Sequence, residues 1–267
     1  MQSMKKGIAL VTGGSKGIGR ALCLRLAMAG YQVFSASRCF KLDSEMNGIT
    51  QLSVDLSDGT ASQSFAIEFI EQYGVPDILV NNAGYGAFFE WGEFPEDEIN
   101  RQIQVLFSSP VQLCRVFAPF MFKKGRGLIL NLSSLATLYP LPYMPLYNAG
   151  KSALSSFTES MLLEYPNYPK FIDFRMGDVR TDFNLSANKQ ETNSDAMKKA
   201  WNQIDKQLQA SIPPERAADQ IVKRVLKTKS GTYFGGSLFH SWFLPKKFRF
   251  LPTKIRILFI KLWYGTI

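Results

Sequence analysis

Short apolar runs alternate along this chain with longer stretches in which apolar residues recur every three or four positions. The short runs are typical of buried strands, and the longer stretches are typical of amphipathic helices. Strands are predicted at 8–12, 32–36, 50–54, 78–81, 128–132, 171–175 and 232–234, and helices at 17–29, 60–73, 96–123 in two pieces, 147–164 and 214–227. The alternation predicts an α/β fold of Rossmann type, a single doubly wound parallel sheet of about seven strands with helices on both faces.

The same pattern predicts one domain followed by a tail. Residues 1–236 hold the alternating elements, and the chain length suits a single α/β domain, since such domains commonly reach about 250 residues. A polar segment at 181–211, rich in Asn, Gln and Lys, interrupts the alternation and is interpreted as a lid or a solvated helical excursion. Residues 237–267 form a basic, aromatic C-terminal tail.

The net charge of +9 is located mainly in that tail. Residues 231–267 contain no Asp or Glu, and their cations are Lys246, Lys247, Arg249, Lys254, Arg256 and Lys261. No nucleic-acid-binding motif accompanies them, so no nucleic acid partner is expected. Two readings of the tail stay open: it packs on the protein or on a partner subunit, or it makes peripheral contact with an anionic membrane, with Pro245 and Pro252 dividing it into short pieces.

Composition excludes several kinds of chemistry. The three cysteines lie far apart, which argues against a disulfide framework or a thiolate zinc site, and His240 is the single histidine, so no metal site is expected. His240 lies in the aromatic tail and is interpreted as a packed or interfacial residue. The residues before Thr12 are too few and too polar for a signal peptide, and no run reaches the roughly 18 apolar residues of a spanning helix. A cytoplasmic protein is expected, peripheral at the inner face of a membrane if the tail binds lipid.

A glycine-rich turn joins the first predicted strand to the first predicted helix. In TGGSKGIG, Gly13, Gly17 and Gly19 suit a tight turn, close backbone approach to a ligand and close helix packing. The positive N-terminal end of the following helix favours a bound anion. The context therefore predicts a pyrophosphate site, and with it a dinucleotide cofactor.

The residues around that turn favour NADP(H). An NAD-selective site places a carboxylate at the end of the second strand, where it accepts bonds from the ribose hydroxyls, but here Ser37 is followed by Arg38. Lys16 lies in the glycine turn itself. Two cations at this place suit a 2′-phosphate through charge-assisted hydrogen bonds, unless both are solvated surface charges.

Four motifs in order resemble the short-chain dehydrogenase/reductase family. They are TGGSKGIG, NNAG ending at Gly84, NLSS ending at Ser134, and YNAGK from Tyr147 to Lys151, and together they span more than half of the chain. The resemblance implies that Ser134 binds the substrate oxygen, that Tyr147 is the acid/base, and that Lys151 holds the nicotinamide ribose and tunes Tyr147. Tyr147 and Lys151 are four residues apart and share a helix face, so the ammonium is expected to lower the tyrosine pKa.

The resemblance also implies a set of cofactor contacts. Asp55 is expected at the adenine, Asn81 with the NNAG turn beside the adenosine ribose, and Thr181 at the nicotinamide carboxamide. The full expected set is Gly13, Ser15, Lys16, Gly17, Ile18, Gly19, Ser37, Arg38, Asp55, Leu56, Asn82, Ala83, Gly84, Tyr147, Lys151, Gly177, Val179 and Thr181.

Three positions depart from the family pattern. Leu106 stands where an asparagine usually completes a proton relay to the lysine, and Ser108, Ser109 or a backbone carbonyl are the candidate substitutes. Met176 precedes Gly177 where the family has proline, which loses one fixed φ. Gly150 precedes Lys151, costs about 1 kcal/mol of helix stability relative to alanine, and is interpreted as making room for the cofactor.

The leading hypothesis is an NADP(H)-dependent carbonyl reductase or alcohol dehydrogenase that acts on a lipophilic small molecule. Two alternatives stay open: a non-catalytic NADP(H)-binding sensor or partner-binding protein, and an epimerase or dehydratase on the same scaffold. The apolar and aromatic residues after NNAG and NLSS are expected either to line a substrate pocket or to be core, and they are Tyr85, Phe88, Phe89, Trp91, Leu138, Tyr139, Leu141 and Tyr143. The resemblance further implies a homodimer or homotetramer through the helices at 96–123 and 147–164.

Overall fold

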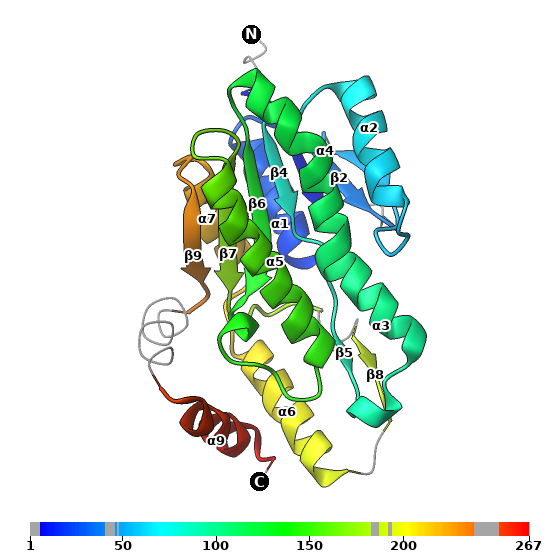
Figure 1. The fold of residues 1–267 in the computed structure, drawn as a ribbon, viewed down its shortest axis with the longest axis vertical. Helices are drawn as coiled ribbons and strands as arrows, with labels where there is room; N and C mark the ends of the chain where they lie inside the picture. The colour runs from blue at the N-terminus through cyan, green and yellow to red at the C-terminus, as the bar shows by residue number, and fades with distance from the viewer. Residues whose placement is uncertain are drawn as a thin grey trace.

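A seven-stranded parallel sheet forms the centre of the molecule (Figure 1). The computed structural model describes residues 6–40, 46, 48–182, 187–191, 194–237 and 251–266. The strand order is β3-β2-β1-β4-β6-β7-β9. Their bounds are β1 Ile8–Thr12, β2 Gln32–Ser37, β3 Thr50–Ser53, β4 Ile78–Asn81, β6 Leu128–Ser134, β7 Lys170–Met176 and β9 Gly231–Gly235. The predicted doubly wound sheet is therefore confirmed.

Helices cover both faces of this sheet. Helices α1 (Gly17–Met28) and α7 (Pro214–Val225) pack on one face, and α2 (Ala61–Tyr73), α4 (Ser109–Lys124) and α5 (Pro145–Glu164) pack on the other. Two separate apolar clusters fill the layers, because strands buried on both faces are apolar at nearly every position. The predicted two-piece helix is observed as α3 (Glu96–Ile103) and α4, joined by a π-helical turn at Gln104–Ser108.

The two strands nearest the candidate site run further than the apolar pattern predicts. Strand β6 continues through Ser133 and Ser134, which pair with Arg175 and Met176 of β7. Strand β6 continues through Ser133, whose hydroxyl donates a hydrogen bond to the buried carboxylate of Asp173 in β7. A polar partner inside the sheet thus replaces the apolar contact on which the strand prediction depends.

The polar segment at 181–211 contains a packed helix, α6 (Asp195–Gln209). The Ser194 hydroxyl caps it by accepting a hydrogen bond from the amide of Met197. Its buried side chains recur at helical spacing and are Met197, Ala200, Ile204 and Leu208. A two-residue strand before it, β8 (Asn188–Lys189), pairs with β5 (Ala87–Phe88). One face of this excursion is therefore in the core of the molecule rather than in solvent.

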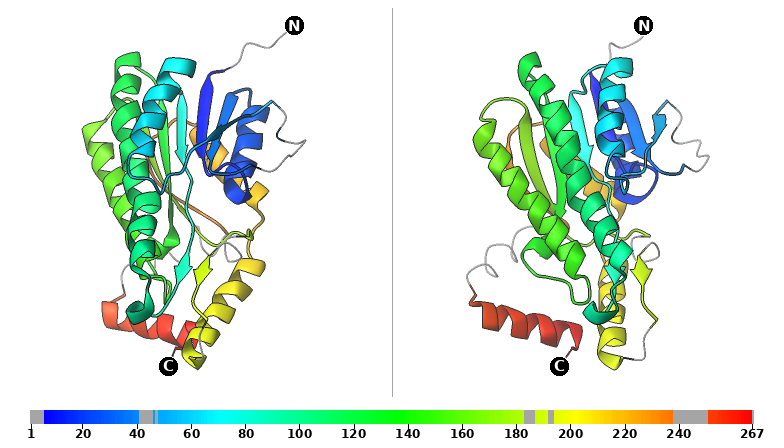
Figure 2. Two further views of the ribbon diagram at one scale, coloured as in Figure 1. Left: turned by 90° about the vertical axis from the view of Figure 1, so that its right-hand side faces the viewer. Right: turned by 45° about the vertical axis from the view of Figure 1, so that its right-hand side comes forward.

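The C-terminal tail ends in helix α9 (Thr253–Tyr264), which lies across the end of the molecule remote from the N-terminus, beside α6 (Figures 1 and 2). Tyr264 is buried among Phe88, Met197 and their neighbours. His240, Pro245 and the cations Lys246, Lys247 and Arg249 lie outside the described residues. Pro252 immediately precedes the helix and is its N-cap residue.

The continuous helical run Glu96–Lys124 is long and apolar enough to cross a membrane by length and composition. The sequence reasoning expected no such run. Its α4 part contributes Leu113, Phe117 and Met121 to the core beneath the sheet, as a core helix of a globular protein does.

Candidate functional site

The glycine-rich turn connects β1 to α1 as predicted. Gly13 and Gly17 have φ values of +68° and +55°, which favour glycine. A Cβ on Gly19 would lie 2.1 Å from the carbonyl oxygen of Gly13, so no side chain fits between the turn and the helix. The turn is thereby drawn tightly against the start of α1, and Ile18 packs on the core below it. This leaves backbone N–H groups and the helix end directed at the same space.

The NNAG segment braces the turn from the next strand. The Asn82 amide donates to the carbonyl oxygens of Thr12 at 2.8 Å and Gly13 at 3.3 Å. The Thr12 hydroxyl accepts from the backbone N–H groups of Asn82 at 3.0 Å and Ala83 at 3.1 Å. Asn81 is directed the other way, into the core, where its amide donates to Asn131 at 2.7 Å. Asn81 therefore links β4 to β6 and does not line the cofactor space.

A cavity of about 260 Å³ opens beside the turn. It is lined by Ser15, Lys16, Gly17, Arg20, Phe40, Met46, Gln51 and Asp182. Lys16 was expected here, whereas Arg20 was missed, because an arginine one turn into an amphipathic helix normally indicates a solvated face. Asp182, which was also missed, adds one carboxylate to the lining. These residues fit a phosphorylated ribose: two cations, the Ser15 hydroxyl and the end of α1 converge on one space.

Three further predicted contacts, Ser37, Arg38 and Asp55, lie at or just after the carboxyl ends of β2 and β3. The amide of Ser15 donates to the Ser37 hydroxyl at 3.3 Å, which ties the turn to the end of β2. Arg38 follows and is exposed. Partial burial favours a higher pKa for Asp55, but hydrogen bonds from the Ser57 amide and hydroxyl and the charges of Arg38 and Arg101 lower that pKa overall. Asp55 is therefore held as a carboxylate beside Arg38.

Ser134 and Tyr147 meet at the carboxyl end of the central strands. Ser134 is the last residue of β6, and Tyr147 lies in the first turn of α5, which begins at Pro145. Their hydroxyls share a hydrogen bond, which acts to lower the pKa of Tyr147. Burial acts more strongly in the opposite direction, the charge of Asp178 adds to it, and the pKa of Tyr147 is raised overall. The phenol therefore stays protonated near neutral pH.

Lys151 lies one helical turn beyond Tyr147 and is 5% exposed. Its Nζ donates to the carbonyl oxygen of Leu132 at 2.6 Å. Burial lowers its pKa to about 8, and the charge of Asp173 opposes this only in part. The pKa of Tyr147 is therefore raised, and not lowered as expected from the nearby ammonium, because burial dominates at both residues.

Replacing Lys151 with methionine is expected to stabilise the folded protein at pH 7 by about 1–2 kcal/mol. Keeping the lysine charged in the folded state destabilises the wild-type protein by up to about 3 kcal/mol. The variant avoids this cost but also loses the hydrogen bond to Leu132, which offsets part of the gain. The folded pKa lies below the unfolded value of 10.5, so the unfolded state binds the extra proton between about pH 8 and 10.5. In urea unfolding curves the advantage of the variant should be full below pH 8, fall as pH rises, and reverse by pH 10.5, where the lysine is neutral in both states and only its hydrogen bond to Leu132 distinguishes wild type. A difference that is constant with pH would contradict it.

Leu106 occupies the place of the expected relay asparagine as an apolar wedge. It is fully buried within the π-helical turn. A Cβ added to Gly150 would lie 2.8 Å from the Leu106 side chain, and a Cβ added to Gly84 would lie 3.0 Å from it. Gly150 thus makes room for Leu106, and the interpretation of Gly150 as room for the cofactor is corrected. Ser109 is not a relay substitute, because its hydroxyl donates to the Leu56 carbonyl at 2.6 Å and accepts from Gln104.

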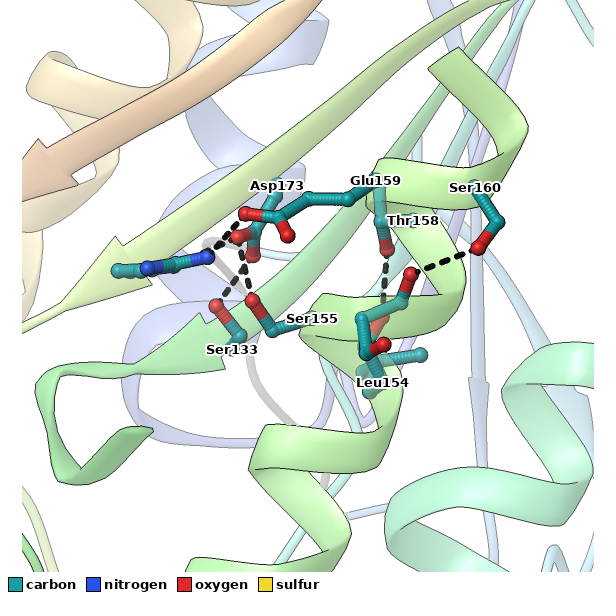
Figure 3. Close-up of polar contacts among 9 residues, drawn as sticks. Ser133, Leu154, Ser155, Thr158, Glu159, Ser160 and Asp173 are labelled. Carbon is teal, nitrogen blue, oxygen red and sulfur yellow. Dashed lines mark hydrogen bonds and ion pairs between the residues drawn. The ribbon is translucent and has the colours of Figure 1, made fainter. Parts of the chain in front are cut away.

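A buried charge network, which the sequence did not indicate, is centred on Asp173 (Figure 3), whose charge acts on Lys151. Asp173 is fully buried in β7. One of its carboxylate oxygens accepts from Ser133, and the other accepts from Ser155 at 2.7 Å and from Nε of Arg175 at 2.7 Å. Arg175 also pairs with Glu159 on α5. The network therefore ties β6, β7 and α5 together directly beneath the residues of the candidate site.

The segment after β7 places the last predicted cofactor contacts. The Gly177 amide donates to Gly235 at 3.0 Å, Val179 bridges to Ile212, and Thr181 lies beside Gly17 of the glycine turn. Asp178 was missed by the sequence reasoning. Its charge acts on Tyr147, and also on Tyr139 and Tyr264, whose pKa values burial and this charge both raise. The Asp178 carboxylate thus lies near three tyrosine hydroxyls at the opening of the candidate site, which is called its mouth below.

Aromatic and aliphatic side chains surround Tyr147 at this mouth. Phe88 is fully buried, with ring centroids 5.3 Å from Tyr143 and 4.9 Å from Trp201. Tyr147 itself packs against this cluster. Trp91 is 63% exposed. A second cavity, of about 350 Å³, lies between α5 and α9 and is lined by Leu138 among others. The candidate pocket residues thus divide among core, cavity wall and surface.

Known proteins provide a comparison for this geometry. Residues 7–192 match the sequence model of the family described as short chain dehydrogenase. The 3-ketodihydrosphingosine reductase of Bacteroides thetaiotaomicron is 28% identical over 231 residues, which are 84% of this chain and 85% of that protein. The probable oxidoreductase EphD of Mycobacterium tuberculosis is 30% identical over 82% of this chain but only 39% of its own length.

Solved structures share the fold. A short-chain dehydrogenase from Streptomyces avermitilis superposes with a TM-score of 0.75 at 24% identity, over 100% of this chain and 94% of that one. A short-chain dehydrogenase/reductase from Burkholderia phymatum, in complex with NAD, superposes with a TM-score of 0.77 at 21% identity, over 97% of each chain. The L-sorbose reductase of Gluconobacter frateurii, in complex with NADPH and L-sorbose, superposes with a TM-score of 0.70 at 23% identity, over 87% of this chain and 95% of that one. Proteins of this fold thus bind either nicotinamide dinucleotide.

Proposed function

Because this chain belongs to the short-chain dehydrogenase family, we propose that it is an NADP(H)-dependent oxidoreductase that interconverts a carbonyl and a secondary alcohol, with Tyr147 as the acid/base. The observation that carries the proposal is the hydrogen-bonded pair of Ser134 and Tyr147 with Lys151 one helical turn beyond, at the same end of the sheet as the glycine turn. The bound nicotinamide would supply or accept the hydride.

The chain's own residues would do the rest. The Ser134 hydroxyl would donate a hydrogen bond to the substrate oxygen and hold it beside Tyr147. Tyr147 would give its proton to that oxygen during reduction and take it back during oxidation. Its raised pKa keeps the phenol protonated at neutral pH, which is the form that donates the proton during reduction. Lys151 would hold the nicotinamide ribose, and a bound cofactor is expected to draw its ammonium into that role.

The alternative of a non-catalytic sensor is disfavoured by the same geometry. Burying Lys151 without a carboxylate partner in contact destabilises the fold, since its pKa falls to about 8. Cofactor binding alone would account for Lys151 at the nicotinamide ribose, but it would not need the hydrogen-bonded pair of Ser134 and Tyr147 beside it. Strain of this kind is typical of sites that hold groups ready for chemistry.

We base the cofactor choice on Lys16 and Arg20, which line the 260 Å³ cavity, and on Arg38, the exposed residue that follows β2. NADPH is expected to bind at least about tenfold more tightly than NADH, a difference of about 1.4 kcal/mol, because Lys16, Arg20 and Arg38 would bond the 2′-phosphate. Arg38→Ala should weaken NADPH binding selectively in calorimetric titrations. Arg216→Ala, which removes an exposed cation from α7, serves as the matched control. Equal affinities for the two dinucleotides, or equal losses of both in Arg38→Ala, would contradict the assignment.

We propose a lipophilic ketone or secondary alcohol as the substrate. The support is the apolar cluster around Tyr147, which includes Phe88, Tyr143 and Trp201. The 3-ketodihydrosphingosine reductase among the relatives makes a long-chain 3-ketone the first compound to test. Oxidation of NADPH should then speed up with acyl chain length, at constant ketone position, and a preference for short polar sugars would contradict it.

Homodimers or homotetramers through α4 and α5 are part of the same proposal. These neighbouring helices expose Phe120, Phe122 and Leu163, the last at 87%. Large apolar side chains exposed together commonly mark protein–protein contacts.

A further inference from the structure

Helix α9 exposes a continuous apolar face. Its side chains Ile255, Leu258, Phe259, Leu262 and Trp263 are 42%, 51%, 57%, 60% and 60% exposed. The first four follow the spacing i, i+3, i+4, i+7, so they form one stripe along the helix, and Trp263 borders it. Fully burying a large apolar side chain stabilises a protein or complex by about 1.5–3 kcal/mol relative to leaving it in water. A partner that covers the stripe would therefore bind favourably.

The opposite face of α9 packs on the protein through Tyr264 and Ile260, while Ile257 on that face is 42% exposed at the wall of the 350 Å³ cavity. Tyr264 is buried and Ile260 packs against the same cluster, on the side of the helix that faces α6. The exposed stripe is therefore not a core face awaiting a rearrangement of this chain. It is a second apolar face, on a helix that is already anchored to the protein through Tyr264 and Ile260.

Cations border the stripe on both sides. Lys254 and Lys261 are seven residues apart and lie along one edge, and Arg256 lies toward the other, at about 100° per residue. No Asp or Glu occurs between residues 231 and 267 to neutralise them. An apolar stripe edged by the exposed cations Lys254 and Lys261 is complementary to a surface that is apolar inside and anionic outside.

We propose that α9 docks this protein on an anionic lipid bilayer, with Leu258, Phe259 and Leu262 in the headgroup boundary and Lys254 and Lys261 on lipid phosphates. The helix of 12 residues is about 18 Å long, too short for the roughly 30 Å of hydrocarbon, so it lies in the plane of the surface. A symmetric contact between two copies is the poorer fit, because it brings the same cations together without acidic partners.

This docking sets the mouth of the candidate site against the bilayer. The inner face of α9 belongs to the apolar cluster that also contacts Tyr147, and the 350 Å³ cavity between α5 and α9 is lined by Ile257 and Ile260. Membrane binding does not depend on the proposed catalysis, and either can fail alone.

Vesicle co-sedimentation of the full chain tests the docking. Wild type should bind vesicles of phosphatidylserine and phosphatidylcholine, bind pure phosphatidylcholine more weakly, and lose part of its binding as salt rises. The double variant Leu258→Glu with Leu262→Glu should partition at least about tenfold less. Met28→Glu with Ile67→Glu, two apolar residues 78% and 43% exposed on α1 and α2, is the matched control and should bind like wild type.

A second readout keeps the test decisive if the charged variant unfolds by circular dichroism. Brominated lipids should quench wild-type tryptophan fluorescence, and Trp263→Phe should remove most of that quenching. Failure of wild type to sediment with anionic vesicles, unchanged binding of a folded double variant, or unchanged quenching in Trp263→Phe would overturn the proposal. Loss of an oligomer by the double variant in lipid-free ultracentrifugation would assign the stripe to a second copy instead.

Discussion

Tyr147→Phe is expected to lower kcat for ketone reduction at least about a hundredfold while changing NADPH affinity by less than about twofold. The substitution removes only the hydroxyl that hydrogen-bonds Ser134 and carries the transferred proton, and leaves the ring in its apolar surroundings. A hundredfold loss corresponds to about 2.7 kcal/mol of transition-state stabilisation, within the usual contribution of a general acid. Steady-state kinetics and calorimetric titration measure the two quantities separately.

Tyr143→Phe is the matched control for this variant. It removes a hydroxyl from a tyrosine of the same apolar cluster, with its ring packed on Phe88. Its kcat should stay within about fivefold of wild type. Normal turnover by Tyr147→Phe, or an equal loss in both variants, would show that Tyr147 is not the acid.

Asp173→Ala is expected to destabilise the protein by at least about 3 kcal/mol. The carboxylate is fully buried and bonds Ser133, Ser155 and Arg175, so its loss leaves a largely buried guanidinium with Glu159 alone. Removing one partner of a buried ion pair typically costs about 3–5 kcal/mol. Urea unfolding gives the difference in the free energy of unfolding.

The double variant Asp173→Leu with Arg175→Met separates the charge effect from the packing effect. Replacing both partners by apolar residues of similar volume avoids the unpaired charge and should recover a substantial part of the stability lost in Asp173→Ala. A loss below about 1 kcal/mol in Asp173→Ala, or a double variant as unstable as the single one, would contradict this account of the network.

The sheet could be predicted from the sequence because parallel strands buried on both faces are nearly continuous apolar runs. Strands β1 and β4 match the predicted ranges, and the turn at Gly13 to Gly19 was recognisable because glycine is the residue that positive φ and close packing require. The end of β6 was not predictable, since Ser133 is satisfied by Asp173 on a strand far away in sequence. Local patterns contain no information on such partners.

The same limit applies to the candidate site. Arg20 and Asp178 reach it from a helix and a loop whose sequences look like ordinary solvated segments, and only the fold brings them to the cavity and to Tyr147. Leu106 was recognised as unusual, but its complement Gly150 was misinterpreted, because the two are 44 positions apart and meet only through the π-helical turn. The pKa of Tyr147 was expected to fall because the sequence shows the nearby lysine but not the burial.

Hydride transfer is the most direct test of the central claim. The wild-type protein is incubated with a long-chain 3-ketone and NADPH carrying deuterium at either C4 position, and the products are analysed by mass spectrometry. The account predicts one deuterium on the carbinol carbon of the alcohol from one of the two labelled cofactors, with the rate reduced at least about a hundredfold in Tyr147→Phe. A protein that binds NADPH yet transfers no deuterium to the ketone, or a Tyr147→Phe variant that transfers it at the wild-type rate, would contradict the account.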